Sequence, residues 1–142
     1  MANYCCIIRT NYFHVKDVSD FENLMNSVWS EDSIDVFRDR DEQGREVVGF
    51  GTYGSIWGLT ENNAEDGDDA SYDKFIKELQ KCVEDDDAIL IMEVGHEKLR
   101  YLTGVTEIIT RNEYKAVDMI ESAVSEASKM LKNSKYSTKV AY

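Results

Sequence analysis

The chain has 142 residues and a formal net charge of −12, from 28 acidic and 16 basic residues. A chain of this length supports one domain with its own core, and the 42% hydrophobic fraction excludes a disordered acidic chain. Because nucleic acids and anionic membranes are polyanions, we expect direct binding to neither of them. We therefore expect a single acidic domain, residues 1–142, whose partners present basic surfaces.

Targeting signals and cysteine spacing point to a reducing compartment. The chain shows neither a signal-peptide pattern nor the roughly 20 consecutive apolar residues that span a bilayer. The cysteines Cys5, Cys6 and Cys82 have no C-x-x-C spacing, so we expect three reduced, buried thiols. The expected location is the cytoplasm.

Apolar periodicity predicts eight elements. In chain order these are a strand at 4–9, a helix at 18–28, strands at 34–38 and 46–53, a helix at 72–83, strands at 88–94 and 99–109, and a helix that ends near 131. The strands 4–9 and 88–94 are mostly apolar, which predicts that both are buried. Sheet structure is expected to continue from residue 53 to about 59, and a loose polar tail is expected after about 133.

Local signals predict where these elements begin and turn. Asp17 has the position of an N-cap, and the turn 41–44 contains Gly44, which can adopt a positive φ. A tight turn is expected at 95–98, and Thr110 and Glu113 have the spacing of a capping box before the last helix.

The order β-α-β-β-α-β-β-α predicts an α+β fold, with a mainly antiparallel sheet and helices packed on one face. Its core resembles a split βαβ arrangement extended by one strand and one helix.

Two nucleotide or metal motifs are present only in part. Gly49, Gly51 and Gly54 spell G-x-G-x-x-G, but strand-like sequence follows them where a dinucleotide site needs a helix. A calcium-like spacing begins at Asp39, but Phe50 stands where the bidentate Glu belongs. We therefore expect no cofactor and no metal, although loose binding of a metal by the acidic loop 61–69 stays open.

Two histidines offer the only route to acid-base chemistry. His96 lies near Glu93 and Glu97 in sequence, which leaves open a small enzyme or a metal-dependent protein that uses these three residues. No G-x-S-x-G motif is present, and no cysteine has a recognisable base, so we expect a protein without catalytic activity.

Acidity is concentrated in the middle of the chain. Residues 1–60 carry a net charge of −5, residues 61–100 carry −8, and residues 101–142 carry +1. Carboxylates spaced along a surface can imitate phosphates and occupy a nucleic-acid site on another protein. The carboxylates expected to bind such a partner are Glu65, Asp66, Asp68, Asp69, Glu84, Asp85, Asp86 and Asp87.

Three stretches resemble a set of small proteins carried by phages and conjugative elements of Gram-positive bacteria: Asn3-Tyr4, residues 9–17 (RTNYFHVKD) and residues 91–101 (IMEVGHEKLRY). The resemblance covers most of the chain and implies no catalytic residues. Such elements also carry acidic anti-defence inhibitors, including antirestriction and anti-CRISPR proteins. By analogy, the resemblance implies that this protein acts against a CRISPR or restriction nuclease.

The sequence thus favours a non-catalytic anti-defence inhibitor that occupies the nucleic-acid site of such a nuclease. Two alternatives stay open: the small enzyme or metal-dependent protein based on His96, and an oligomeric accessory protein of a mobile element. In the oligomeric alternative, exposed aromatic residues such as Tyr53 and Trp57 would form a self-interface.

Overall fold

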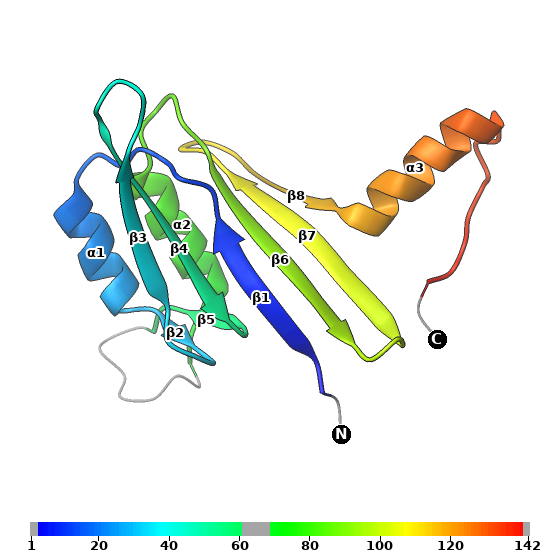
Figure 1. Ribbon diagram of the computed structural model, residues 1–142, viewed down its shortest axis with the longest axis horizontal. Coiled ribbons are helices and arrows are strands. Elements are labelled where there is room, and N and C mark those ends of the chain that lie inside the picture. Colours follow the sequence, from blue (N-terminus) through cyan, green and yellow to red (C-terminus); the bar gives the residue numbers. More distant parts are fainter. Residues whose placement is uncertain (1–2, 61–68, 141–142) are drawn as a thin grey trace.

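The computed structural model describes residues 3–60 and 69–140, which form one six-stranded sheet, a small two-stranded sheet and three helices (Figure 1). The strands of the large sheet are β1 (Cys5–Thr10), β3 (Asp35–Arg40), β4 (Glu46–Tyr53), β6 (Ile89–Glu97), β7 (Tyr101–Ile109) and β8 (Tyr114–Asp118). The small sheet pairs β2 (Trp29–Ser30) with β5 (Ile56–Gly58). The helices are α1 (Val18–Asn26), α2 (Tyr72–Cys82) and α3 (Met119–Leu131).

The large sheet has the order β3-β4-β1-β6-β7-β8, and every neighbouring pair is antiparallel. Strands β1 and β3 are therefore parallel to each other with β4 between them, and α1 connects them. Strands β4 and β6 are likewise parallel with β1 between them, and α2 connects these. Two interlocked split βαβ units of this kind make a ferredoxin-like core, which β7 and β8 extend at one edge. The predicted α+β class and antiparallel sheet are confirmed.

The core lies between the sheet and two helices, α1 and α2, which cover one face of it (Figure 1). Four fully buried phenylalanines from four segments meet there: Phe13, Phe21, Phe50 and Phe75. Their ring centroids lie 5.6 Å apart for Phe13 and Phe21 and 5.9 Å apart for Phe50 and Phe75, with edge-on geometry. Aromatic pairs at this spacing and angle are favourable beyond the area that they bury.

Local signals explain the first two helices and the first hairpin. The carboxylate of Asp17 accepts the backbone N–H of Asp20 at 3.0 Å, which confirms Asp17 as the N-cap of α1. The hydroxyl of Ser71 caps α2 in the same way through Lys74. Gly44 has a φ of 80° in the β3–β4 turn, as expected.

The predicted start of the last helix was wrong, because a further strand precedes it. The hydroxyl of Thr110 does accept the backbone N–H of Glu113 at 3.0 Å, but this bond closes a hairpin turn between β7 and β8. The N-cap of α3 is Asp118, whose carboxylate accepts the backbone N–H groups of Ile120 and Glu121. A threonine hydroxyl that accepts the N–H three residues later occurs both at helix N-caps and in turns. The spacing of Thr110 and Glu113 alone therefore does not distinguish a helix start from a hairpin turn.

Several other boundaries differ from the prediction. Strand β6 continues through residues 95–97, and the chain turns at 98–100, where Lys98 has a φ of 49°. Segment 56–58 pairs with β2 and so leaves the large sheet. Helix α1 ends at Asn26, two residues before the predicted end.

Helix α3 does not join the helical layer. It projects away from the sheet beyond β8, and none of its residues is buried (Figure 1). The prediction of helices packed on one face therefore holds for α1 and α2 only. Within the described residues, no helix is long and apolar enough to cross a membrane.

Candidate functional site

The acidic run 84–87 forms the connection between α2 and β6, and basic side chains from other segments pair with it. Asp85 binds the guanidinium of Arg111 at 2.8 Å and the ammonium of Lys16 at 3.4 Å. The guanidinium of Arg45 lies 3.7 Å from the carboxylate of Glu84. These contacts lower the pKa of Asp85, chiefly through the hydrogen bond from Arg111.

Asp87 is held by His14, a residue without a predicted role. Its Oδ2 accepts the backbone N–H of His14 at 2.8 Å and lies 2.7 Å from the ring Nδ1. The other ring nitrogen, Nε2, lies 2.7 Å from Oδ2 of Asp41 in the β3–β4 turn. Two carboxylates favour the charged imidazolium, so hydrogen bonds to Asp41 and Asp87 raise the pKa of His14.

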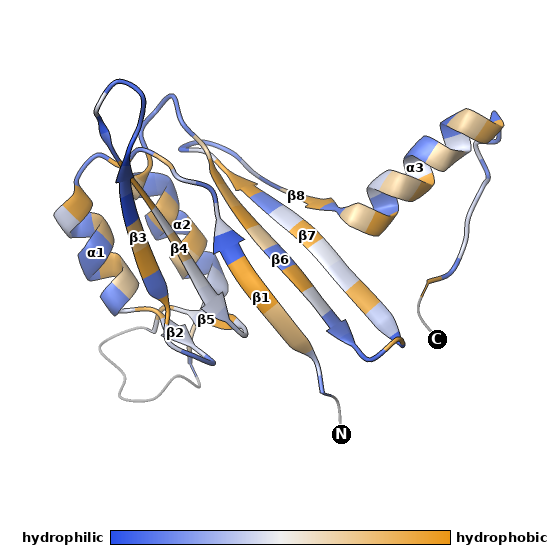
Figure 2. Cartoon of the chain, in the orientation of Figure 1, coloured by the Kyte–Doolittle hydropathy of each residue, from blue (hydrophilic) through white to orange (hydrophobic). Residues whose placement is uncertain are grey.

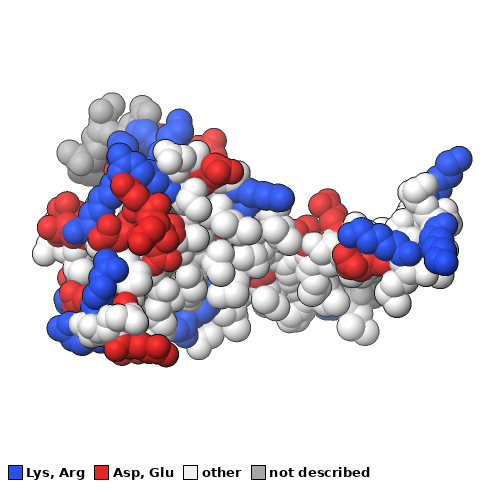
Figure 3. Space-filling view, turned by 90° about the horizontal axis from the view of Figure 1, so that it is seen from above, with Lys and Arg blue, Asp and Glu red and all other residues white. Residues whose placement is uncertain are grey.

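These contacts reduce the negative electrostatic potential around the run 84–87. Glu84, Asp85 and Asp87 each have a cationic neighbour, whereas Asp86 has no ion pair with the described residues. Figure 3 shows Lys and Arg interleaved with Asp and Glu over this end of the molecule. The run 84–87 therefore presents much less negative potential than its sequence suggests.

Asp69, another of the predicted acidic residues, lies at the opposite end of α2. Asp69 is exposed and precedes the helix, while the run 84–87 follows it. Eleven helical residues rise about 16 Å, so Asp69 and the run 84–87 do not form one continuous patch. Glu65, Asp66 and Asp68 lie outside the described residues.

The sheet face opposite α1 and α2 is a second candidate surface, which we call the open face. Six residues on it define its centre: Cys5 and Ile7 of β1, Tyr53 of β4, Val94 and His96 of β6, and Leu102 of β7. Tyr53 is 70% exposed, Val94 66% and Ile7 54%. Figure 2 shows apolar colouring along most of β1 and on parts of β6 and β7. An apolar patch of this kind on a sheet is typical of an interaction surface.

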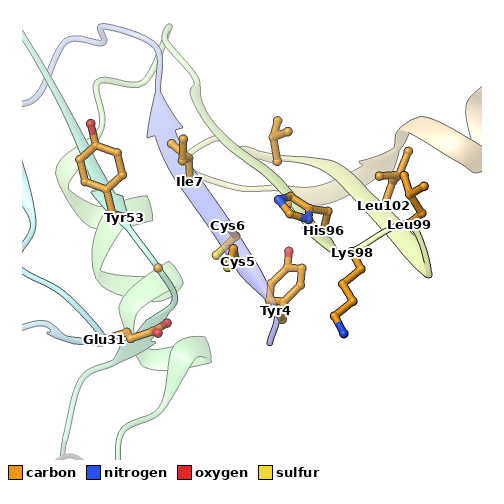
Figure 4. Close-up of a pocket in the computed structure, with 13 residues that line it drawn as sticks. Tyr4, Cys5, Cys6, Ile7, Glu31, Tyr53, His96, Lys98, Leu99 and Leu102 are labelled. Atoms are coloured by element: carbon orange, nitrogen blue, oxygen red, sulfur yellow. The ribbon is translucent and has the colours of Figure 1, made fainter. Parts of the chain in front are cut away.

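A hollow of about 940 Å³ lies at one end of the open face, where β1 begins and β6 ends (Figure 4). Its walls are largely apolar, from Ile7, Tyr53 and Leu102, and Glu31 and Lys98 add charges at the rim. The hollow is shallow and open, so it suits an inserted side chain of a partner protein better than an enclosed small molecule.

His96 cannot act together with Glu93 and Glu97 as one of the alternatives requires. Side chains alternate along a strand, so His96 lies on the open face while Glu93 and Glu97 lie on the opposite face. Glu93 there accepts a hydrogen bond from the hydroxyl of Tyr4 at 2.6 Å. Burial and this hydrogen bond raise the pKa of Tyr4.

Cys5 is the cross-strand neighbour of His96. Its thiol, however, points to the backbone oxygen of Asn3 at 3.6 Å, and no hydrogen bond joins it to His96 among the described residues. A thiol–imidazole pair without that bond lacks the geometry of an activated nucleophile. All three cysteines are free, but the expectation that all are buried was wrong, because Cys5 is exposed and the other two are half-buried.

Nucleotide and metal chemistry find no support in the parts of the chain that the structure describes. No group of three or more His, Cys, Asp or Glu is placed there to hold a metal ion. Gly49 and Gly51 lie inside β4, and β5 follows Gly54 almost at once. No helix therefore opens at these glycines, as a dinucleotide site requires.

Comparison with family models, with curated proteins and with solved structures returned no match.

Sequence reasoning named Tyr53 and Trp57 as exposed aromatic residues, which the structure confirms, but it missed the open face as a whole and the role of His14. Strands β1 and β6 carry apolar residues at successive positions, a pattern typical of a sheet covered on both sides. This pattern predicts that a strand is buried, but it does not predict which face of the sheet stays uncovered. Pairing between His14, Asp41 and Asp87 depends on loops far apart in the chain and has no local signal.

Proposed function

We propose that this protein is a non-catalytic binding protein that inhibits a nucleic-acid-handling enzyme by covering its basic surface. The candidate targets are CRISPR and restriction nucleases in the bacterial cytoplasm, where a phage or conjugative element would have to act. The likeness of residues 9–17 and 91–101 to proteins of such elements supports this choice of target.

The observation that carries the proposal is the charge of the molecule outside α3 and the tail. Residues 1–118 contain 26 acidic and 12 basic residues, a net charge of −14. Such a surface speeds association with a basic partner and repels nucleic acid. Because cations offset most of the run 84–87, the attraction would arise from the whole surface together with exposed carboxylates such as Asp69 and Asp86.

The ion pairs decide which residues should be changed in a test. Reversing the charge of Asp85 or Asp87 would break contacts within the protein and would confuse folding with binding. The double variant Asp69→Lys/Asp86→Lys breaks no ion pair among the described residues. The control, Glu121→Lys/Glu126→Lys, makes the same change of charge on α3, where it removes only the exposed ion pair of Glu126 with Lys129 among the described residues.

Binding of the purified protein to Cas9 and to a type I restriction enzyme would be measured across a salt series, with and without their nucleic acid. We expect salt-sensitive binding that nucleic acid displaces, and a dissociation constant roughly tenfold higher for Asp69→Lys/Asp86→Lys than for the control. If the protein binds neither enzyme, the proposal that CRISPR and restriction nucleases are its targets is refuted. Binding that is indifferent to salt and to the double variant would refute charge mimicry.

A further inference from the structure

The apolar residues of the open face favour burial, but neither α1 nor α2 covers this face. Residues 5–8 of β1 and 89–92 of β6 are apolar and alternate between the two faces of the sheet, yet α1 and α2 cover only one face. Val94 and Ile7 thus remain more than half exposed in the middle of a six-stranded sheet.

Helix α3 also has an apolar surface without a packing partner among the described residues. Its 13 residues include an apolar side that no other element buries, formed by Met119, Ile120, Ala123, Val124, Ala127, Met130 and Leu131. Met130 is 83% exposed and Leu131 60%. A helix of this length is marginal in water without tertiary packing, so its amphipathic sequence indicates a packing partner.

Helix α3 meets the open face of its own chain at Met119, because Gly104 pairs with Val94 and so lies on that face. The rest of the helix does not fold back over the face (Figure 1). Asp118 is both the last residue of β8 and the N-cap of α3, so no loop residue allows the helix to turn back. Met119 is held over Gly104 of β7, where a Cβ would lie 2.9 Å from the Met119 sulfur. From this fixed point α3 points away from the sheet (Figure 1). Its packing partner is therefore another molecule.

Charge favours a second copy of the same chain as that molecule. Residues 119–140 carry four lysines and two glutamates, a net charge of +2, against −14 for residues 1–118. Asp35 and Asp39 of β3 lie on the same side of the sheet as Phe37, which contacts Arg9 there. Lys129 in the last turn of α3 and the lysines that follow the helix, Lys132, Lys135 and Lys139, can therefore meet carboxylates beside the open face of a neighbouring copy.

We propose that two copies form a symmetric dimer by reciprocal exchange, in which α3 of each copy packs on the open face of the other. A two-fold axis makes the two contacts identical, so each dimer buries two helices and two sheet faces. The arrangement covers both unpartnered apolar surfaces of the chain at once.

Sedimentation equilibrium of the full chain tests the proposal. We expect twice the monomer mass at micromolar concentration. Val124→Glu on α3 and Val94→Glu on the open face should each raise the dimer dissociation constant at least about 100-fold, because each buries an unpaired charge. Ser125→Glu, on the polar side of α3, is the matched control and should leave the dimer intact.

Mixing the two monomeric variants identifies the exchange itself. A copy with Val94→Glu keeps a normal α3, and a copy with Val124→Glu keeps a normal open face. One of the two contacts can therefore form in the mixture, and a heterodimer should appear although neither variant dimerises alone. Circular dichroism of each variant would show that both remain folded.

Three results would overturn the proposal. A wild-type chain that stays monomeric at all concentrations would show that the two surfaces do not meet. A dimer that Val94→Glu dissociates and Val124→Glu does not would show that the sheet faces pack on each other without α3. Failure of the mixed variants to associate, with both folded, would exclude reciprocal exchange.

Discussion

Oδ2 of Asp87 contacts both the backbone and the ring of His14. It accepts the backbone N–H of His14 at 2.8 Å and lies 2.7 Å from Nδ1 of the ring. With Asp41 at Nε2, the imidazolium joins the loop after β1, the β3–β4 turn and the loop after α2. Three segments far apart in sequence therefore depend on one titratable ring.

Stability should depend on pH through this ring. The pKa of His14 is raised above 6.5, so its contribution is complete below that value and is lost as the pH rises through the folded-state pKa. The pKa of Asp41 is lowered by the hydrogen bond from His14. Burial opposes ionisation of Asp87, but hydrogen bonds from the backbone of His14 and Ala88 outweigh it and lower that pKa as well. The stabilisation by these two carboxylates is lost as the pH falls below 3.8.

Urea unfolding at a series of pH values checks this prediction. The wild-type midpoint should fall as the pH rises from 6.5 through the folded-state pKa of His14, whereas the midpoint of His14→Gln should stay nearly constant over that interval. An equal fall in both proteins would assign the effect to a group other than His14.

Gly58→Ala should destabilise the protein strongly. Gly58 has a φ of 120°, and a Cβ there would collide with the backbone oxygen of Ser71, which bonds to Leu59. Strain and the displaced contact should cost at least about 2 kcal/mol. Gly44→Ala is the matched control: its φ is 80°, but nothing lies within 4 Å of the added atom, so about 1 kcal/mol is expected. Equal losses in urea unfolding would contradict the clash.

Phe50→Ala should remove the centre of the core. Its ring contacts those of Phe13, Phe21 and Phe75 and is fully buried. Loss of burial together with the cavity should lower the free energy of unfolding by about 3–5 kcal/mol. Leu99→Ala, in a turn and 83% exposed, should change it by less than about 0.5 kcal/mol. A small effect of Phe50→Ala in denaturant titration would place the core elsewhere.

Tyr72 and Tyr114 provide a matched pair around Glu107. The hydroxyl of Tyr72 donates to Glu107 at 2.6 Å, and that of Tyr114 donates to its other carboxylate oxygen. Burial and the bond to Glu107 raise the pKa of Tyr114 to about 12 and raise that of the more buried Tyr72 as well. Tyr72→Phe should cost about 1–2 kcal/mol and Tyr114→Phe less, because water can reach Glu107 on the exposed side. Thermal unfolding that ranks them in the opposite order would contradict this.

Elements with strong local signals were predicted correctly. The cap at Asp17 and the turn at Gly44 depend on bonds or dihedral angles within a few residues, which sequence spacing reveals. Strand β8 was missed because its five residues have no apolar alternation and pair only with β7 at the sheet edge. Charge alone predicted the acidic candidate site, so cationic partners from distant segments, such as Lys16 and Arg111, could not be foreseen.

Composition and periodicity by themselves determined an acidic α+β domain and most of its strands and helices, because these depend on the spacing of apolar residues along the chain. The split βαβ core was a prediction that the strand order confirmed. Only the tertiary structure decided which face of the sheet is covered, that α3 stands apart from it, and that the run 84–87 is largely paired. These features depend on strand order and on contacts across the fold. The same contacts place His96 away from Glu93 and leave two apolar surfaces for another molecule to cover.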